Sequence, residues 1–139
     1  MVKSNEDLEG YFNKLDRRFE VLEDGTFLVA ASSKQTPVAV RLLPPVVVLQ
    51  VKIGDAPKDD AAVEVKLFRR LLELNAHDLV HAAYGLEGDA IMLSAALEAD
   101  TLDLNELEAT LADIGMALAE HVSQLRELAA SSEQASKQE

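Results

Sequence analysis

Two histidines four residues apart, His77 and His81, come closest in this sequence to a metal site. On one helix, histidines at this spacing share a face and can bind zinc, and zinc proteases add a glutamate directly after the first histidine. Here Asp78 follows His77, and its side chain is one methylene group shorter. The pair also straddles an expected helix end and strand start, where residues four apart lie about 13 Å from each other. We therefore expect no metal site and no cofactor.

The other motifs give no support for catalysis. The segment Gly85–Asp89 is too acidic and has too few glycines for a phosphate-binding loop, and it lies in an expected hairpin. No serine stands in a Gly-x-Ser-x-Gly motif, and cysteine is absent. Carboxylates are so common in this chain that no pair identifies a general acid and base. We expect a protein without enzymatic activity, and an acid-site hydrolase is the weakest alternative.

The composition excludes several kinds of partner. The 139 residues include 25 Asp and Glu against 13 Lys and Arg, which gives a net charge of −12. This charge argues against binding to nucleic-acid phosphates, and only 4% of the residues are aromatic, with no tryptophan for base stacking. No apolar run approaches the roughly 18 residues of a membrane span, and the polar start Met1–Asp7 does not resemble a signal peptide. We expect a cytoplasmic protein with no nucleic-acid or membrane partner.

The acidic residues are concentrated in the second half of the chain. Residues 1–58 hold 8 basic and 8 acidic residues, whereas residues 59–139 hold 5 and 17. Between Leu71 and Leu125 there are eleven acidic residues and no Lys or Arg. Such a stretch either attracts a basic partner or is a solvated surface that keeps the protein soluble. Both interpretations remain open at this point.

The first half of the sequence predicts one helix and four strands. Ser4 is a typical N-cap, and apolar residues then recur at helical spacing through residues 5–17. Asp24-Gly25 is typical of a two-residue type I′ hairpin turn, whereas Pro44-Pro45 is expected to interrupt the sheet because proline donates no hydrogen bond. The four predicted strands are Phe19–Leu22, Thr26–Ala31, Val38–Leu43 and Val46–Ile53.

The second half predicts a helix, a hairpin and a long final helix. Residues 61–75 carry apolar side chains on more than one face, which indicates a buried helix, and Asn75 is a plausible left-handed end. The strands Leu79–Tyr84 and Ala90–Leu97 follow. A capping box at Asp103–Glu106 then opens a helix that continues to Leu128 and places His121 on its apolar seam.

The predicted order of elements is α-β-β-β-β-α-β-β-α. Strands joined mainly by hairpins, without regular βαβ alternation, indicate an α+β fold in which an antiparallel sheet of hairpins packs against helices. We expect residues 1–130 to form a single domain. The polar residues 131–139 are expected to be a disordered tail.

Four segments together resemble the YbjN-like family, which shares its fold with the type III secretion chaperones: Leu67–Asn75, Tyr84–Asp89, Ile91–Leu93 and Leu102–Leu118. The segment Leu8–Val29 is also similar to the start of that family. The resemblance implies a small, acidic, cytoplasmic and non-enzymatic protein, usually a homodimer, that holds an extended segment of a protein partner. The alternative is a regulatory or small-ligand-sensing domain without catalysis, which should have an enclosed pocket with converging polar groups.

The alternation of side chains along two strands gives the candidate binding residues. In Val46–Ile53, the odd-numbered residues are all large and apolar and should face the helices. The opposite face would then carry Val46 and Val48 together with Gln50 and Lys52, and this half-apolar face would be open to a partner unless the last helix covers it. The candidate residues for partner binding or for a dimer interface are Val46, Val48, Met92 and Ala96. With the acidic stretch around them, the preferred partner segment would be extended, apolar at alternate positions and net basic.

Overall fold

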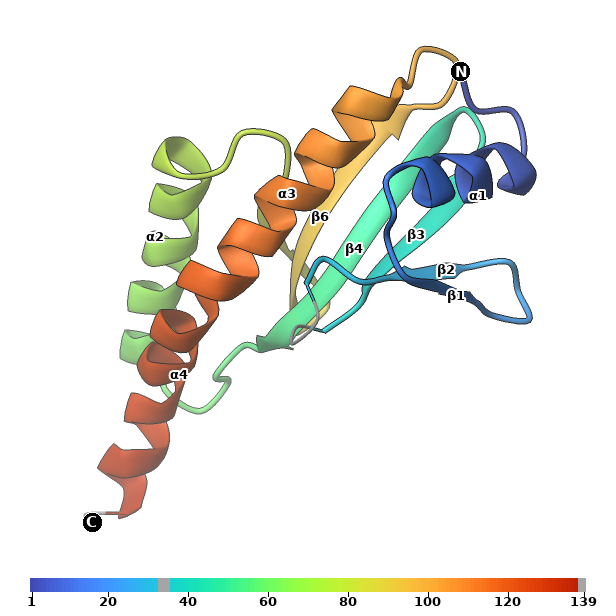
Figure 1. Cartoon of the computed structure of the whole chain (residues 1–139). Coiled ribbons are helices and arrows are strands. Elements are labelled where there is room, and N and C mark those ends of the chain that lie inside the picture. The colour runs from blue at the N-terminus through green and yellow to red at the C-terminus, as the bar shows by residue number, and fades with distance from the viewer. Residues whose placement is uncertain (33–35, 138–139) are drawn as a thin grey trace.

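Antiparallel strands form one six-stranded sheet in the order β1-β2-β3-β4-β6-β5 in the computed structural model, which describes residues 1–32 and 36–137 (Figure 1). Its strands are β1 Phe19–Val21, β2 Phe27–Val29, β3 Val38–Leu43, β4 Val46–Asp55, β5 Ala83–Glu87 and β6 Ala90–Glu98. The helices of the described residues are α1 Asn5–Lys14, α2 Ala61–His77, α3 Leu104–Glu120 and α4 Val122–Lys137. This architecture is the predicted α+β fold, with one additional helix at the end.

The helices lie on one face of the sheet, and that face holds the core. On β4, Val47, Leu49, Val51 and Ile53 are all buried, as the alternation predicted. Helix α1 reaches the same face, because the ring of Phe12 packs 5.3 Å from that of Phe27. The last helices are also on this side. Tyr84 of β5 pairs with Leu93, which is buried on this face, and its hydroxyl group is hydrogen-bonded to His121 at the end of α3. The last helix therefore does not cover the outer face (Figure 1).

The first hairpin turn differs from the predicted type I′ turn. That turn needs positive φ at both central residues, but of Asp24 and Gly25 only Gly25 has one, at 88°. The Gly25 amide donates to the Leu22 carbonyl at 3.0 Å, which makes residues 22–25 a tight turn with Gly25 after its apex. The Thr26 amide bonds the Asp24 carboxylate at 3.0 Å. The loop is thus longer than two residues, and the type I′ prediction is wrong.

The two prolines do not interrupt the sheet. Leu43 pairs with Val46, so Pro44 and Pro45 form the turn between β3 and β4, with a cis bond between them. A proline pair is tolerated there because the residues of a tight turn need not donate to the ladder. Strand β3 has the predicted bounds, and β4 is two residues longer than predicted, with a register shift between Lys52 and Gly54.

Asn75 does not end helix α2, which continues to His77. Instead its side chain receives the Tyr84 amide at 2.7 Å and donates to the Tyr84 carbonyl at 3.1 Å, which joins α2 to β5. Strand β5 begins at Ala83 instead of Leu79. The amides of residues 80–82 cannot pair with a neighbouring strand, because the carboxylate of Asp113 accepts their hydrogen bonds.

The predicted single last helix is divided at His121 into α3 and α4. The backbone of residues 131–137, which were expected to be disordered, continues α4. This segment has no large apolar residue; beside three serines it holds one each of glutamate, glutamine, alanine and lysine, which have high helix propensity. Residues 138 and 139 of the expected tail lie outside the described residues, and a single domain over residues 1–130 remains a prediction.

Candidate functional site

The four candidate interface residues lie together on the outer face of the sheet. Val48 is directly opposite Ala96 on the neighbouring strand, and Met92 is opposite Lys52. Val46, Val48 and Met92 are partly buried and Ala96 is exposed, whereas Val47, Leu93 and Ala95, which point to the opposite face, are buried. The predicted strand faces are therefore confirmed. The role of these residues in binding stays a prediction.

The charges beside this apolar patch have both signs. Arg41 of β3 pairs with Val48, and Lys52 pairs with Met92, so two candidate residues have a cation as their cross-strand neighbour. Glu98 is opposite Val46. Some of the eleven acidic residues are engaged elsewhere: Glu108 forms an ion pair of 2.7 Å with Arg17. The immediate neighbours of the candidate residues therefore carry mixed charge, and the expected negative surround is not present there.

On the helix-bearing face of the sheet, hydrogen bonds link the end of α2, strand β5 and the junction of α3 and α4. His121 is only 3% exposed; its Nδ1 lies 2.9 Å from the Tyr84 hydroxyl and its Nε2 lies 3.0 Å from Asp78 Oδ2. When Asp78 is ionised, Nε2–H donates to it and Nδ1 accepts the Tyr84 proton. These hydrogen bonds thereby fix the junction of α3 and α4 against the end of α2 and against β5. Because Tyr84 is buried, we interpret this chain of hydrogen bonds as a structural link between the elements.

The hydrogen-bonded, buried Tyr84 predicts that the protein loses stability in alkaline solution. Burial and, after it, the negative charges of Asp78 and Asp113 raise the pKa of Tyr84 above its ordinary value of 10.0. A raised folded-state pKa means that the unfolded chain ionises first, so the free energy of unfolding should decline as the pH rises above about 10. Urea unfolding of Tyr84→Phe and of the unchanged protein across this range measures the difference. An identical decline in both proteins would contradict the assignment.

The two histidines considered for metal binding are both exposed. Asp78, which follows His77, is directed to His121 and not toward the pair. Among the described residues, no group of three or more His, Asp or Glu side chains is placed to hold a metal ion. The absence of a metal site thus remains an expectation from the sequence.

A second apolar surface lies on α2 and β5, and the sequence reasoning missed it. Leu67, Leu71 and Leu74 of α2 are buried, but Val65 is 66% exposed and Leu72 is 68% exposed. The signal is present in the sequence, because residues 61–75 carry apolar side chains on more than one face, but this pattern also fits complete burial of the helix. They instead mark a helix with one face in the core and another face without a partner in the described chain.

Next to this surface, β5 is an edge strand, because within the described part of the chain it pairs with β6 alone. Leu86 on this strand is 51% exposed, and Val80 in the preceding connection is 81% exposed. We name Val65, Leu72, Val80 and Leu86 the α2–β5 surface. An edge strand beside exposed apolar side chains is a site where another chain can add to the sheet.

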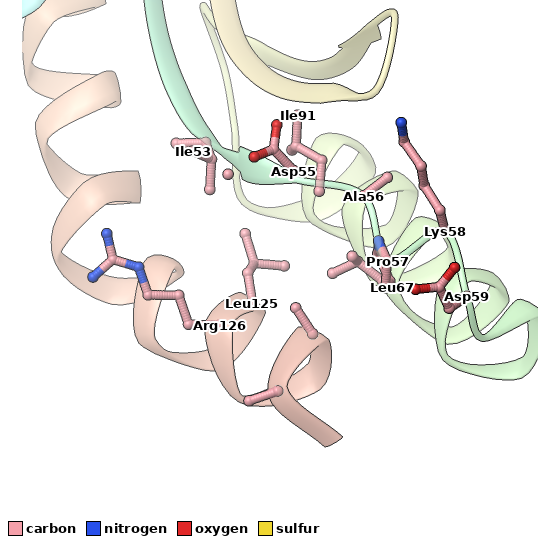
Figure 2. Close-up of a pocket in the computed structure, with 13 residues that line it drawn as sticks. Ile53, Asp55, Ala56, Pro57, Lys58, Asp59, Leu67, Ile91, Leu125 and Arg126 are labelled. Atoms are coloured by element: carbon pink, nitrogen blue, oxygen red, sulfur yellow. The ribbon is translucent and has the colours of Figure 1, made fainter. Parts of the chain in front are cut away.

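A cavity of about 580 Å³ lies at the other end of α2, between α2, α4 and the end of β4 (Figure 2). Ile53, Ile91, Leu67 and Leu125 contribute its apolar lining, and Asp55, Lys58, Asp59 and Arg126 are the charged residues around it. The regulatory alternative predicted an enclosed pocket with converging polar groups. This cavity is open to solvent, and its lining combines polar and apolar surface, with the apolar part somewhat larger.

A six-stranded antiparallel sheet with helices on one face and an uncovered apolar patch on the other defines a chaperone-like α+β fold. The CesT_Tir_1 family model matches residues 1–131. The chain therefore belongs to the CesT_Tir_1 family, a family of type III chaperones. No curated protein matches the sequence.

Solved structures show the same fold at low sequence identity. A chain of the heterodimeric ExoU–SpcU complex, from the type III secretion system of Pseudomonas aeruginosa, is 16% identical with a TM-score of 0.63, over 87% of this chain and 96% of that chain. YbjN of E. coli, a proposed transcription regulator, is 12% identical with a TM-score of 0.63, over 96% and 95%. The Yersinia pestis type III secretion chaperone SycH, solved with a fragment of YscM2, is 16% identical with a TM-score of 0.55, over 83% and 99%. The YbjN-like, chaperone-like fold is confirmed.

No helix in the described part of the chain combines the length and the apolar character that a membrane span requires.

Proposed function

We propose that this protein is a non-enzymatic, cytoplasmic chaperone-like module that holds an extended segment of a protein partner on the outer face of its sheet. The observation that carries the proposal is the position of Val46, Val48, Met92 and Ala96 on β4 and β6, on the face that no described helix covers. An extended segment could bury these side chains by laying its own alternate apolar residues across them. Membership of a type III chaperone family supports this function.

The structural neighbours support a protein as the partner. The ExoU–SpcU structure is a complex of two proteins, and SycH was solved with a fragment of YscM2. For this chain, the net charge of −12 favours a basic segment. Because Arg41 and Lys52 lie within the face, this preference would come from long-range attraction by the whole protein and would mainly speed encounter.

Val48→Asp tests the binding face. It places a charge in the centre of the proposed contact, and we expect it to weaken partner binding by about 2 kcal/mol or more, which is about 30-fold. The fold should persist, because Val48 faces outward and Arg41 is its cross-strand neighbour. Capture of partners from native lysate by the unchanged protein, followed by mass spectrometry and calorimetry with the captured protein, measures the effect.

The matched control is Ala119→Asp, which places the same charge at an exposed position on α3. We expect one dominant, stoichiometric partner with the unchanged protein and the control, and its loss with Val48→Asp. Equal capture by all three proteins would refute the outer face as the binding site. Unfolding of Val48→Asp would mean that Val48 belongs to the core.

We also propose that the protein is a homodimer, and that its second copy is held by the α2–β5 surface. The sequence predicts a dimer contact on the outer sheet face, but the most exposed of the large apolar side chains described lie elsewhere: Val65, Leu72 and Val80 are each at least 66% exposed. Asn75 bonds β5 to α2, so these side chains and the free strand edge belong to one connected structure. A two-fold arrangement would bury both copies of this surface and leave the outer face to the partner.

The second candidate function is that of a regulatory domain. It is favoured by the cavity between α2 and α4, and by the structural similarity to YbjN. A ligand-sensing domain would bind a small molecule in this cavity, independently of Val48. Binding of a free small molecule that Val48→Asp leaves unchanged would support this regulatory function.

A further inference from the structure

The cavity between α2 and α4 is formed by residues from four parts of the chain. Ile53 at the end of β4, Ile91 of β6, Leu67 of α2 and Leu125 of α4 are each at most 8% exposed. In Figure 2 the side chains of Ile53, Ile91 and Leu125 point toward the same space, and Lys58 points away from it. These four side chains are packed mainly against their neighbours, and the lining of the cavity as a whole is mixed, with somewhat more apolar than polar surface.

Small residues explain why this space is empty. The wall between the large apolar side chains is made by Gly54, Ala56, Ala129 and Ala130. A side chain on Gly54 would meet nothing within 4 Å. Among the residues whose side chains the structure describes, none of the large ones fills the space between these small residues.

The charges at the rim balance each other. Lys58 is held in an ion pair by Asp89, which raises the pKa of the lysine, and Lys52 pairs with Asp55 at 3.1 Å. The two other charged residues of the rim, Asp59 and Arg126, have opposite signs. This arrangement offers no net charge to an ionic ligand, so a neutral, apolar occupant is the complementary one.

We propose that this cavity holds one large apolar side chain, such as leucine, methionine or phenylalanine, from the bound partner segment. The inference rests on the proposed function, because it identifies a second anchor point for that segment. The opening to solvent favours a side chain over a free molecule: the partner's backbone can continue along the charged rim while its side chain enters the cavity and contacts the apolar part of the lining. Ile53 and Ile91 are on the helix-bearing face, so this anchor is separate from Val48 on the outer face.

The first test uses isotope-labelled protein and capped amino acids as probes. We expect N-acetyl-leucine amide and N-acetyl-phenylalanine amide to shift the backbone amide resonances of Gly54, Ala56 and Ala129, and the corresponding lysine and glutamate probes to leave them unchanged. Toluene is titrated in parallel as a free hydrophobic ligand. If toluene binds and the capped amino acids do not, the cavity serves a small molecule and the proposal is wrong. The absence of any shift also overturns it.

The second test fills the cavity. Ala129→Phe is compared with Ala119→Phe, which makes the same substitution at an exposed position on α3. Peptides are selected from a random library with the unchanged protein. We expect these peptides to require a large apolar residue, to bind Ala129→Phe at least tenfold more weakly and to bind Ala119→Phe unchanged. Ala130→Leu provides a smaller filling if circular dichroism shows that the first variant is unfolded.

The outcomes separate this inference from the proposed function. If Val48→Asp abolishes peptide binding and the filled variants bind normally, the cavity is not an anchor and the outer face still is. If the filled variants and Val48→Asp all bind normally, or if no peptide is selected, both proposals fail. Loss of binding in the filled variants, together with the shifts from the leucine and phenylalanine probes, supports the cavity as an anchor.

Discussion

Asp113→Ala is expected to lower the free energy of unfolding by about 3 kcal/mol, more than any other single polar substitution proposed for this protein. The carboxylate of Asp113 is nearly buried and accepts the backbone amides of Val80, His81 and Ala82 at 3.2, 2.8 and 3.0 Å. Bonds to an ionised acceptor contribute more than neutral ones, and removal of the carboxylate leaves the buried Ala82 amide without an acceptor and takes the acceptor from the part-buried amides of Val80 and His81. The connection between α2 and β5 would lose what holds it to α3.

Urea unfolding monitored by circular dichroism measures this effect. Asp113→Asn keeps one acceptor oxygen and should cost less, about 1 to 2 kcal/mol. Asp100→Ala is the control, because Asp100 is exposed and should change the stability by less than about 0.5 kcal/mol. If Asp113→Ala were as stable as this control, the carboxylate would not be what holds the connection.

Val65→Glu combined with Leu72→Glu is expected to convert the proposed dimer into a monomer of 15.1 kDa. Each substitution places a charge in an apolar contact, and the pair should weaken association by about 3 kcal/mol or more, which is more than a hundredfold. Both positions are exposed in a single chain and glutamate suits a helix, so the monomer should stay folded. Sedimentation equilibrium at micromolar concentration gives the mass.

The control for the dimer is Val21→Glu, which changes a valine that is 50% exposed on β1, at the opposite edge of the sheet. This variant should remain a dimer, and so should Val48→Asp. A monomeric unchanged protein would refute the homodimer. A dimer that the double substitution leaves intact would move the interface away from the α2–β5 surface, and dissociation by Val48→Asp would place it on the outer sheet face.

Local patterns predicted much of the backbone. Strand β3 has its predicted bounds, and the N-caps at Ser4 and Asp103 are present, with side chains that accept amides one turn later. These features depend on residues close in sequence. The errors occur where a residue has a distant partner: Asn75 bonds Tyr84 instead of ending a helix, and Asp113 delays the start of β5.

The sequence by itself determined which side chains of β4 face inward, because the alternation of a strand depends only on neighbouring residues and their hydrophobicity. The candidate residues Val46, Val48, Met92 and Ala96 follow from that alternation. Only the tertiary structure decided that their face stays uncovered, that α2 exposes Leu72, and that Gly54 and Ala129 border a cavity. Each of these depends on how elements distant in the sequence pack together, and the local periodicity of apolar residues does not specify which face of a helix contacts another element.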